Sequence, residues 1–349
     1  MRWLRLAFLP VSVVTLVSAA LIVPLPRYVE RPGQVLSLDD CVIVGEDNQA
    51  VTGDFLLTTV NVRQATLADF VRAAVQSDTK IEEPGTLVPH GMDSGSYFRQ
   101  QRVKFRSSAD LAAAIGLNAA GLSARISGRG AYVRAVAPNS PADEVLFPAD
   151  VIVGVDDRRV RSARDLREAV VDGTEGQHLR LTVRRDGRTL TIDVAPVVLD
   201  GRLRIGVVPE TFDRKITLPV DVEVRSGPIG GSSAGLMMAL TVFDKASEEV
   251  DLAAGRIVAG TGDIDEEGHV APIGGVDLKI LAAQRQGAEL FLAPRADAPA
   301  AKAALSDGSP LQIVVVDTFE QARQALLDTA PETPPASERA GTCPYGPPA

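Results

Sequence analysis

The stretch GGSSAGLMMALTVF, residues 230–243, places a glycine-rich turn directly before an almost wholly apolar run. This pattern predicts a loop followed by a buried helix, with Ser233 at the amino end of that helix. Unpaired backbone N–H groups and the positive end of the helix dipole lie at such an end, and both stabilise an oxyanion. Ser233 is therefore a candidate nucleophile, and the alternative is an ordinary serine N-cap on a buried helix.

A second stretch, PIGGVDLK at residues 272–279, breaks the chain at two glycines and then starts another predicted helix. Lys279 follows Val276 by three positions and precedes Ala283 by four, so it falls on the apolar side of that helix. A desolvated lysine amine has a lowered pKa and can activate a serine hydroxyl without a histidine. The alternative is a lysine whose stem covers the core while its ammonium reaches water.

The three histidines, His90, His178 and His269, offer a different mechanism. The pattern Gly231-x-Ser233-x-Gly235 also fits the nucleophile elbow of α/β hydrolases, which needs a histidine later in the chain. Only His269 follows the serine, and it lies in an acidic turn that indicates a hairpin tip. A His-dependent esterase is thus a second alternative, and it predicts a hydrogen bond between His269 and a serine.

Three motifs taken together resemble the proteolytic domain of the Lon family of Ser/Lys peptidases. They read Gly231-Ser232-Ser233-Ala234-Gly235, Thr261-Gly262-Asp263-Ile264 and Pro272-Ile273-Gly274-Gly275-Val276-Asp277-Leu278-Lys279. The resemblance implies an α+β proteolytic domain in which Ser233 is the nucleophile and Lys279 the general base. It also implies that Thr261 orients the lysine.

The residues beside the nucleophile depart from the family at two positions. Ser232 stands where the family usually has proline, and Gly230 stands where many members have aspartate. Ser233 is preferred over Ser232 because it directly precedes Ala-Gly. Gly231, Ser232 and Ala234 are therefore expected to support the site.

Residues 120–198 form a separate predicted unit. Strands are expected at 131–136 and 151–155, a helix around Leu166, and a hairpin across Asp186-Gly187. Between Val133 and Asp156 the sequence resembles the PDZ signature, and PDZ domains bind extended peptides at a sheet edge. Ala149 replaces the usual glycine and a Gly-Leu-Gly-Phe loop is not evident, so a spacer domain that shields an active site is the alternative.

The amino terminus predicts a membrane anchor over residues 1–26. Leu6 to Pro26 carries no charge and is flanked by arginines, and about 20 such residues span a bilayer. A cleaved signal peptide with Ser18-Ala19-Ala20 at its cleavage site is the alternative. Both the anchor and the signal peptide predict an extracytoplasmic location for the rest of the chain, and the anchor places it at the cell membrane. In that oxidising compartment Cys41 and Cys343 could form a disulfide or remain two thiols.

The remaining chain divides by composition. Residues 27–49 are expected to be an irregular stalk, followed within 27–119 by a strand from Thr52 and a helix carrying Leu67, Phe70 and Val71. Glu82 to Ser96 is expected to be a loop. By the family resemblance, that strand and helix open the proteolytic domain, which continues at 199–328 after an inserted PDZ-like domain. Residues 329–349, rich in proline, are expected to be a flexible tail.

Composition and motif content exclude several classes of function. The net charge of −9 and 4% aromatic residues argue against nucleic-acid binding. The two cysteines lie in no CxxC or Cys/His cluster, so no metal site is expected. No GxxxxGK[ST] loop is present in the sequence, so no ATP or other cofactor is implied.

The order of anchor, PDZ-like unit and Lon-type domain resembles the PDZ-containing Lon-like peptidases of bacteria. The resemblance implies a membrane-anchored, ATP-independent serine endopeptidase that acts on polypeptide substrates, presented or gated by the PDZ-like unit. It also makes a homo-oligomeric ring an expectation. The alternative from another class is an inactive peptide-binding scaffold that keeps the fold.

Overall fold

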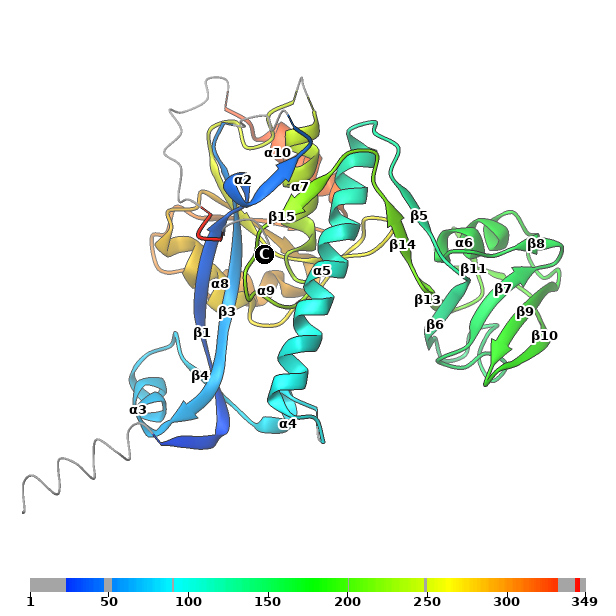
Figure 1. Cartoon of the computed structure of the whole chain (residues 1–349), viewed down its shortest axis with the longest axis horizontal. Coiled ribbons are helices and arrows are strands. Elements are labelled where there is room, and N and C mark those ends of the chain that lie inside the picture. The colour runs from blue at the N-terminus through cyan, green and yellow to red at the C-terminus, as the bar shows by residue number, and fades with distance from the viewer. Residues whose placement is uncertain are drawn as a thin grey trace, which may run out of the picture. The chain divides into compact units, whose positions relative to one another are not determined.

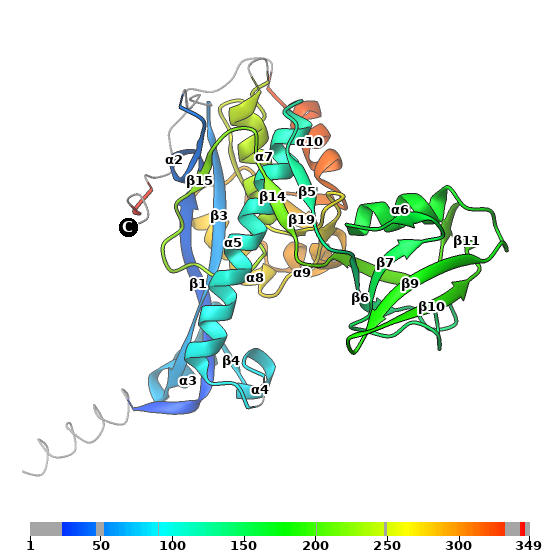
Figure 2. The ribbon, with the colours of Figure 1, turned by 45° about the vertical axis from the view of Figure 1, so that its right-hand side comes forward.

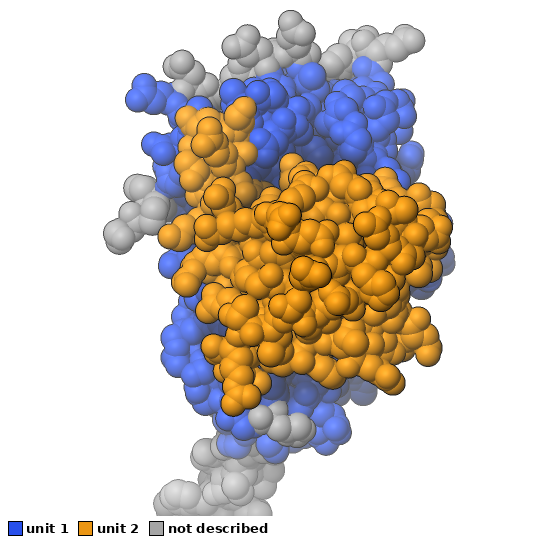
Figure 3. Space-filling view, turned by 90° about the vertical axis from the view of Figure 1, so that its right-hand side faces the viewer, with its two compact units in different colours: residues 1–122, 220–349 blue, residues 123–219 orange. Residues whose placement is uncertain are grey.

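The computed structural model describes residues 23–46, 52–89, 91–199, 201–247, 250–331 and 343–345. The chain forms two compact units, which Figure 3 distinguishes by colour. Unit 1 comprises residues 1–122 and 220–349, and unit 2 comprises residues 123–219. The chain is of mixed α+β class, and the segment of unit 2 interrupts the sequence of unit 1.

Unit 1 is built on a six-stranded sheet of order β20-β19-β16-β3-β1-β4. The strands from β20 to β3 run parallel, whereas β1 and β4 are antiparallel to their neighbours. Its elements are β1 (Pro24–Ser37), α2 (Leu38–Cys41), β2 (Val42–Val44), β3 (Asp54–Thr66), α3 (Leu67–Val75), β4 (Lys80–Glu82), α4 (Pro84–Leu87), α5 (Ser94–Ala119), β15 (Val222–Val224), α7 (Gly235–Ala246), β16 (Ile257–Gly260), β17 (Asp263–Ile264), β18 (Val270–Ala271), α8 (Val276–Arg285), β19 (Leu290–Pro294), η1 (Arg295–Asp297), α9 (Ala298–Ala303), β20 (Gln312–Val316) and α10 (Phe319–Asp328).

Helix α7 occupies the core of unit 1, as the apolar run 236–243 predicted. Every residue from Gly235 to Lys245 is buried. The long helix α5 packs closely against α7 (Figure 1). At the contact, a Cβ on Gly116 would lie only 2.6 Å from the Ala239 carbonyl oxygen. Glycine at 116 therefore lets the two helix backbones approach each other.

The prediction of an irregular stalk over residues 27–49 was wrong. Residues 24–37 form strand β1, which pairs with β3 along most of its length and is followed by α2 and β2. The register shifts between Pro32 and Val35, where a Cβ on Gly33 would overlap Thr59. The pair Pro32-Gly33 predicted an irregular backbone, but β1 continues through it, and the pair produces only a local shift in its register with β3.

The prediction of a loop over residues 82–96 was also wrong in part, and helix α5 was missed. Helix α4 lies within that stretch, and α5 begins at Ser94 behind the N-cap Asp93, whose side chain accepts the Ser96 N–H at 2.9 Å. The amino-terminal half of α5 is mostly polar and exposed, so its sequence carries a weak helical pattern.

Residues 1–22 of the predicted membrane anchor lie outside the described residues. Its last residues, Pro24 to Pro26, open strand β1 instead of extending a helix. Across the ranges that the structure describes, none of the helices combines the length and apolarity that a bilayer crossing requires.

Cys41 and Cys343 form a disulfide that joins positions 302 residues apart. Most of the predicted tail, 332–342 and 346–349, lies outside the described residues. The Tyr345 hydroxyl donates a hydrogen bond of 2.9 Å to Gln34 Oε1, and its ring lies so close to Gly227 that any side chain there would overlap it. Residues 343–345 are therefore held against β1 and the loop that leads to Ser233.

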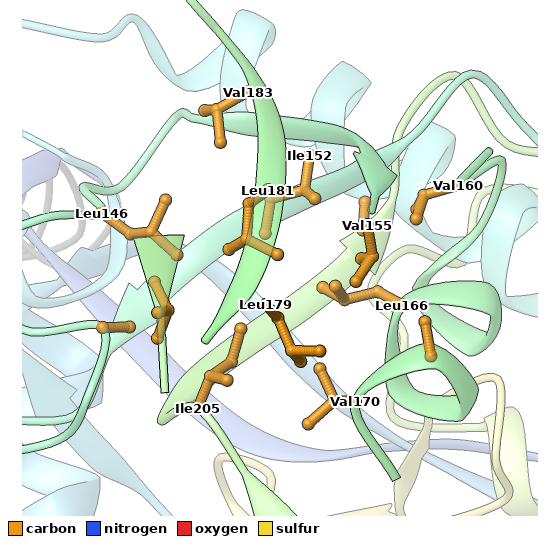
Figure 4. Packing of buried hydrophobic residues seen from close by; sticks show 14 of the residues in the cluster. Leu146, Ile152, Val155, Val160, Leu166, Val170, Leu179, Leu181, Val183 and Ile205 are labelled. Atoms are coloured by element: carbon orange, nitrogen blue, oxygen red, sulfur yellow. The ribbon is translucent and has the colours of Figure 1, made fainter. Parts of the chain in front are cut away.

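Unit 2 contains a second sheet, of order β10-β9-β7-β6-β13. Leu146, Ile152, Leu166, Leu181 and Ile205 belong to its core (Figure 4). Its elements are β5 (Arg125–Ser127), β6 (Ala131–Val136), β7 (Val151–Val155), β8 (Arg158–Arg159), α6 (Ala163–Val171), β9 (Leu179–Arg185), β10 (Arg188–Val194), β11 (Val197–Leu199), β12 (Arg202–Arg204), β13 (Val207–Thr211) and β14 (Lys215–Thr217).

The predicted strands at 131–136 and 151–155 and the hairpin across residues 186–187 are present. The compact unit extends beyond the predicted boundary at residue 198, because β13 pairs with β6 and β14 pairs with β5. Residues 199–219, assigned to the proteolytic domain from the sequence, therefore belong to unit 2. These pairings join strands more than 70 residues apart, and a local pattern does not reveal them.

Two buried carboxyl groups of unit 1 should make its stability depend on pH. Burial raises the pKa of Asp244 to about 7 and that of Asp54 to about 6. A folded-state pKa above the unfolded value means that stability is complete below about pH 4 and is lost as the pH rises through the folded pKa. We expect Asp244→Asn, which keeps an acceptor for the Leu252 N–H, to raise the free energy of unfolding at pH 8 by more than about 1 kcal/mol.

Urea unfolding of both proteins at pH 4.5 and pH 8 measures this difference. The two free energies should converge at the lower pH, and Asp307→Asn, at an exposed site, should change neither. A variant that is less stable than the parent at pH 8 would show that the charged carboxylate of Asp244 stabilises the fold.

Candidate active site

Ser233 lies in the turn immediately before α7, where the sequence placed it. The Gly235 N–H donates to the Ser232 carbonyl oxygen at 3.1 Å, which closes the turn. A Cβ on Gly235 would lie 2.8 Å from Ile264 Cγ2, so the site of Gly235 has no room for a side chain. The glycine after Ser-Ala thus allows the serine turn to press against the Thr261–Ile264 segment.

The Thr261-Gly262 segment holds the backbone of the serine. The Gly262 N–H donates to the Ser233 carbonyl oxygen at 2.8 Å, and the Thr261 hydroxyl donates to the same oxygen at 2.9 Å. In return, the Leu236 N–H donates to the Gly262 carbonyl oxygen at 3.1 Å. Two motifs separated by 28 positions therefore form one hydrogen-bonded unit.

Lys279 reaches the serine hydroxyl from helix α8. Its Nζ lies 2.7 Å from Ser233 Oγ and 2.8 Å from Thr261 Oγ1, both hydrogen-bond distances. The Lys279 residue is 3% exposed, so the alternative of an amine that reaches water does not hold. The structure thus brings together the three residues that the family resemblance singled out.

Burial changes the acid–base state of Lys279. Desolvation lowers the pKa of its amine to about 7, against a smaller opposing effect of Asp297. Asp297 Oδ2 accepts a hydrogen bond of 2.9 Å from the Ile273 N–H. At neutral pH a large share of the amine is therefore uncharged and has a lone pair available for a proton.

Helix α5 supplies contacts to this loop that the sequence did not predict. The Gly231 N–H donates to the Gln101 carbonyl oxygen at 2.8 Å, and Ser108 Oγ donates to the Ser232 carbonyl oxygen at 3.2 Å. Ala234 is buried, and its carbonyl oxygen accepts the Met238 N–H at 3.0 Å. Residues 231, 232 and 234 thus shape the loop through their backbone.

The histidines do not complete a second catalytic arrangement among the described residues. His269 is exposed in the β17–β18 hairpin, and its Nδ1 lies 3.0 Å from Asp265 Oδ2. No hydrogen bond between His269 and a serine is found in the part of the chain that the structure describes, His178 is exposed, and His90 lies outside the described residues. The geometry therefore favours the lysine mechanism over a His-dependent esterase.

Within the described ranges, Asp265, Glu267 and His269 form a group that could hold a metal ion, since their ligand atoms lie within 4.8 Å of one another. Two of them are exposed, and Asp265 and His269 are already hydrogen bonded to each other. Acidic hairpin tips of this kind are common without an ion, so we assign no metal role to them.

Two families match successive parts of the chain, and neither match begins or ends at a boundary between the units. Residues 191–328 match the Lon protease (S16) C-terminal proteolytic domain, and residues 103–195 match the PDZ domain. The chain contains a Lon-type proteolytic domain and a PDZ domain. The Lon-type match contains Ser233, Thr261 and Lys279, and the PDZ match covers most of unit 2.

Similar curated proteins are Lon proteases. The chain is 33% identical over 140 residues to the Lon protease of Roseiflexus castenholzii, covering 40% of this chain and 17% of that protein. It is 32% identical over 127 residues to Lon protease 2 of Bacillus subtilis, covering 36% of this chain and 21% of that protein. The chain thus spans about a fifth of the length of these curated relatives.

Among solved structures, the PDZ domain of the SdrC-like protein of Listeria monocytogenes matches 23% of this chain and 87% of that chain. The identity is 22% and the TM-score is 0.22.

Proposed function

We propose that this protein is an ATP-independent serine endopeptidase that hydrolyses peptide bonds through Ser233 and Lys279. The observation that carries the proposal is the 2.7 Å distance between Lys279 Nζ and Ser233 Oγ inside a buried site. The Lon-type match over residues 191–328 supports the same reaction class.

In the acylation step, the uncharged Lys279 amine accepts the hydroxyl proton while Ser233 Oγ attacks the scissile carbonyl carbon. The negative charge that develops on the carbonyl oxygen is stabilised by backbone N–H groups at the start of α7, those of Ser233 and Ala234. The Lys279 ammonium then gives its proton to the leaving amine, and an ester of Ser233 remains.

In the deacylation step, Lys279 accepts a proton from water as the water oxygen attacks the ester carbonyl, and Ser233 leaves with that proton restored. Thr261 accepts one N–H of the amine through Oγ1, while its own hydroxyl hydrogen is committed to the Ser233 carbonyl oxygen. The threonine thereby directs the lysine lone pair toward Ser233 Oγ.

The proposal also includes the location and the role of the second domain. The uncharged stretch from Leu6 supports a single-pass anchor in the cell membrane, and the Cys41–Cys343 disulfide supports an extracytoplasmic location, because disulfides persist in oxidising compartments. The PDZ domain supports polypeptide substrates that it presents to or withholds from the site. A homo-oligomeric ring, suggested by the Lon-type domain, is testable by mass measurement in solution.

A serine-reactive fluorophosphonate tests the proposal directly. We expect it to modify Ser233 and to be found by mass spectrometry in the tryptic peptide that runs from Ser226 to Lys245. The Ser232→Ala variant should be labelled to the same extent, whereas Ser233→Ala should not be labelled. A natively folded protein that takes up no label at either serine would instead be a peptide-binding scaffold with an inactive site.

A further inference from the structure

Helix α3 has its apolar face turned outward. Leu67 is 44% exposed, Phe70 37%, Val71 59% and Val75 77%. The spacing of these residues places them on one side of the helix. The buried residue of α3 is the charged Asp69, so the usual orientation of an amphipathic helix is reversed here.

The polar side of α3 is fixed to unit 1 by directional contacts. Asp69 Oδ2 accepts the Thr66 N–H at 2.8 Å, and Asp69 Oδ1 accepts from Arg63 Nη2 at 2.6 Å. Arg72 Nη2 lies 3.2 Å from Asp78 Oδ2. These bonds hold the two charged residues of α3 against the protein, and the apolar residues consequently face away from it.

Helix α3 lies next to the start of strand β1. Thr66, the N-cap residue of α3, pairs in register with Pro24, the first residue of β1. Figures 1 and 2 both show α3 beside the beginning of β1. The residues that precede Pro24 in the sequence are the uncharged stretch from Leu6. A chain that leaves a membrane at this stretch therefore enters the fold directly beside α3.

We propose that α3 lies in the interfacial region of the lipid bilayer, with Leu67, Phe70, Val71 and Val75 directed toward the acyl chains. This inference rests on the proposed membrane anchor and adds a second point of contact to it. Exposed apolar faces of helices mark interaction sites, and an amphipathic helix at a membrane surface buries its apolar face at the boundary between headgroups and acyl chains. Such a contact would fix the orientation of unit 1 relative to the bilayer.

Charge argues for an apolar contact instead of an electrostatic one. The arginines near α3 have carboxylate partners, since Arg63 pairs with Asp69, Arg72 with Asp78 and Arg27 with Glu83. The contact is therefore expected in vesicles of a zwitterionic lipid and should not depend on anionic lipid or on salt.

The experiment uses the full chain with the substitution Val71→Cys, reconstituted in vesicles of dioleoylphosphatidylcholine. An environment-sensitive fluorophore is attached to the new cysteine. No reductant is added during labelling, so that the native disulfide stays closed. Vesicles that contain brominated lipid should reduce the fluorescence by about twofold or more, because bromine quenches only within the acyl region. Val75→Cys should give the same result. Gln324→Cys, an exposed position on α10 at the other end of unit 1 (Figures 1 and 2), is the matched control and should not be quenched.

Three results would overturn the inference, and they are distinguishable. A chain that does not move with the vesicles in a flotation assay overturns the proposed anchor and the inference together. A chain that floats with an unquenched probe at position 71 overturns the inference alone. A probe that is shielded but not quenched, together with crosslinking between two copies of Val71→Cys, assigns the face to a second copy. Labelling of Ser233 by fluorophosphonate is independent of all three results.

Discussion

Replacement of Ser233 by alanine is expected to lower kcat for peptide hydrolysis by at least about 10⁴-fold. The hydroxyl lost is the group that Lys279 Nζ contacts at 2.7 Å. The contacts that hold the loop, from Gly262 N–H and Thr261 Oγ1, go to the Ser233 carbonyl oxygen, and alanine retains that oxygen. The variant should therefore fold normally, with an unchanged circular dichroism spectrum and melting temperature, while steady-state cleavage of an unstructured polypeptide is lost.

Ser232→Ala provides the matched control, because it removes a hydroxyl one position away. Ser232 contributes its carbonyl oxygen to Gly235 N–H and to Ser108 Oγ, and alanine keeps both contacts. We expect kcat within about threefold of the parent, in the range of substitutions that spare the reacting groups. If Ser232→Ala were inactive and Ser233→Ala active, the assignment of the nucleophile would be reversed.

Replacement of Lys279 by methionine should lower kcat by at least about 10³-fold, because the hydroxyl then lacks its proton acceptor. Arginine at this position should also be inactive, since a guanidinium does not release its proton. Lys302→Met, which changes an exposed lysine on α9, should retain full activity. Hydrolysis by Lys279→Met at the parental rate would place the general base elsewhere.

The parent enzyme should show the ionisation of this lysine. Because burial lowers the pKa of Lys279 to about 7, kcat/KM should rise about tenfold per unit below pH 7 and level off above it. A substrate without titratable groups, assayed from pH 5.5 to 8.5, measures the curve. A flat profile across that range would contradict a lysine base.

The stability of Lys279→Met separates a catalytic loss from a folding defect. The pKa of the buried amine lies below its unfolded value, so the amine destabilises the fold increasingly as the pH falls from about 10.5 toward 7, and the full effect persists below 7. Methionine has no charge to bury. The variant should therefore melt at or above the parental temperature at pH 6.5 while remaining inactive.

Several elements could be predicted because their signals are local. The glycine turn and apolar run of residues 230–243 predicted the loop and buried helix α7, and the turn residues Asp186-Gly187 predicted the hairpin of unit 2. Strand β1 and helix α5 could not be predicted in this way. The irregular register of β1 at Pro32 is accommodated by β3, and the mostly polar first half of α5 is exposed to solvent.

The sequence was sufficient to identify Ser233, Thr261 and Lys279 as candidates, because three glycine-containing motifs in that order resemble one family of peptidases. It could not supply the protonation state of the lysine, since the low pKa arises from burial, which depends on residues packed from distant parts of the chain. Nor could it orient α3: the spacing of Leu67, Phe70 and Val71 marks an apolar face, but only the contacts of Asp69 and Arg72 with unit 1 turn that face outward. The order of residues along the chain identifies the catalytic candidates, whereas the burial of the Lys279 amine and the outward orientation of α3 depend on packing between parts of the chain that are distant in sequence.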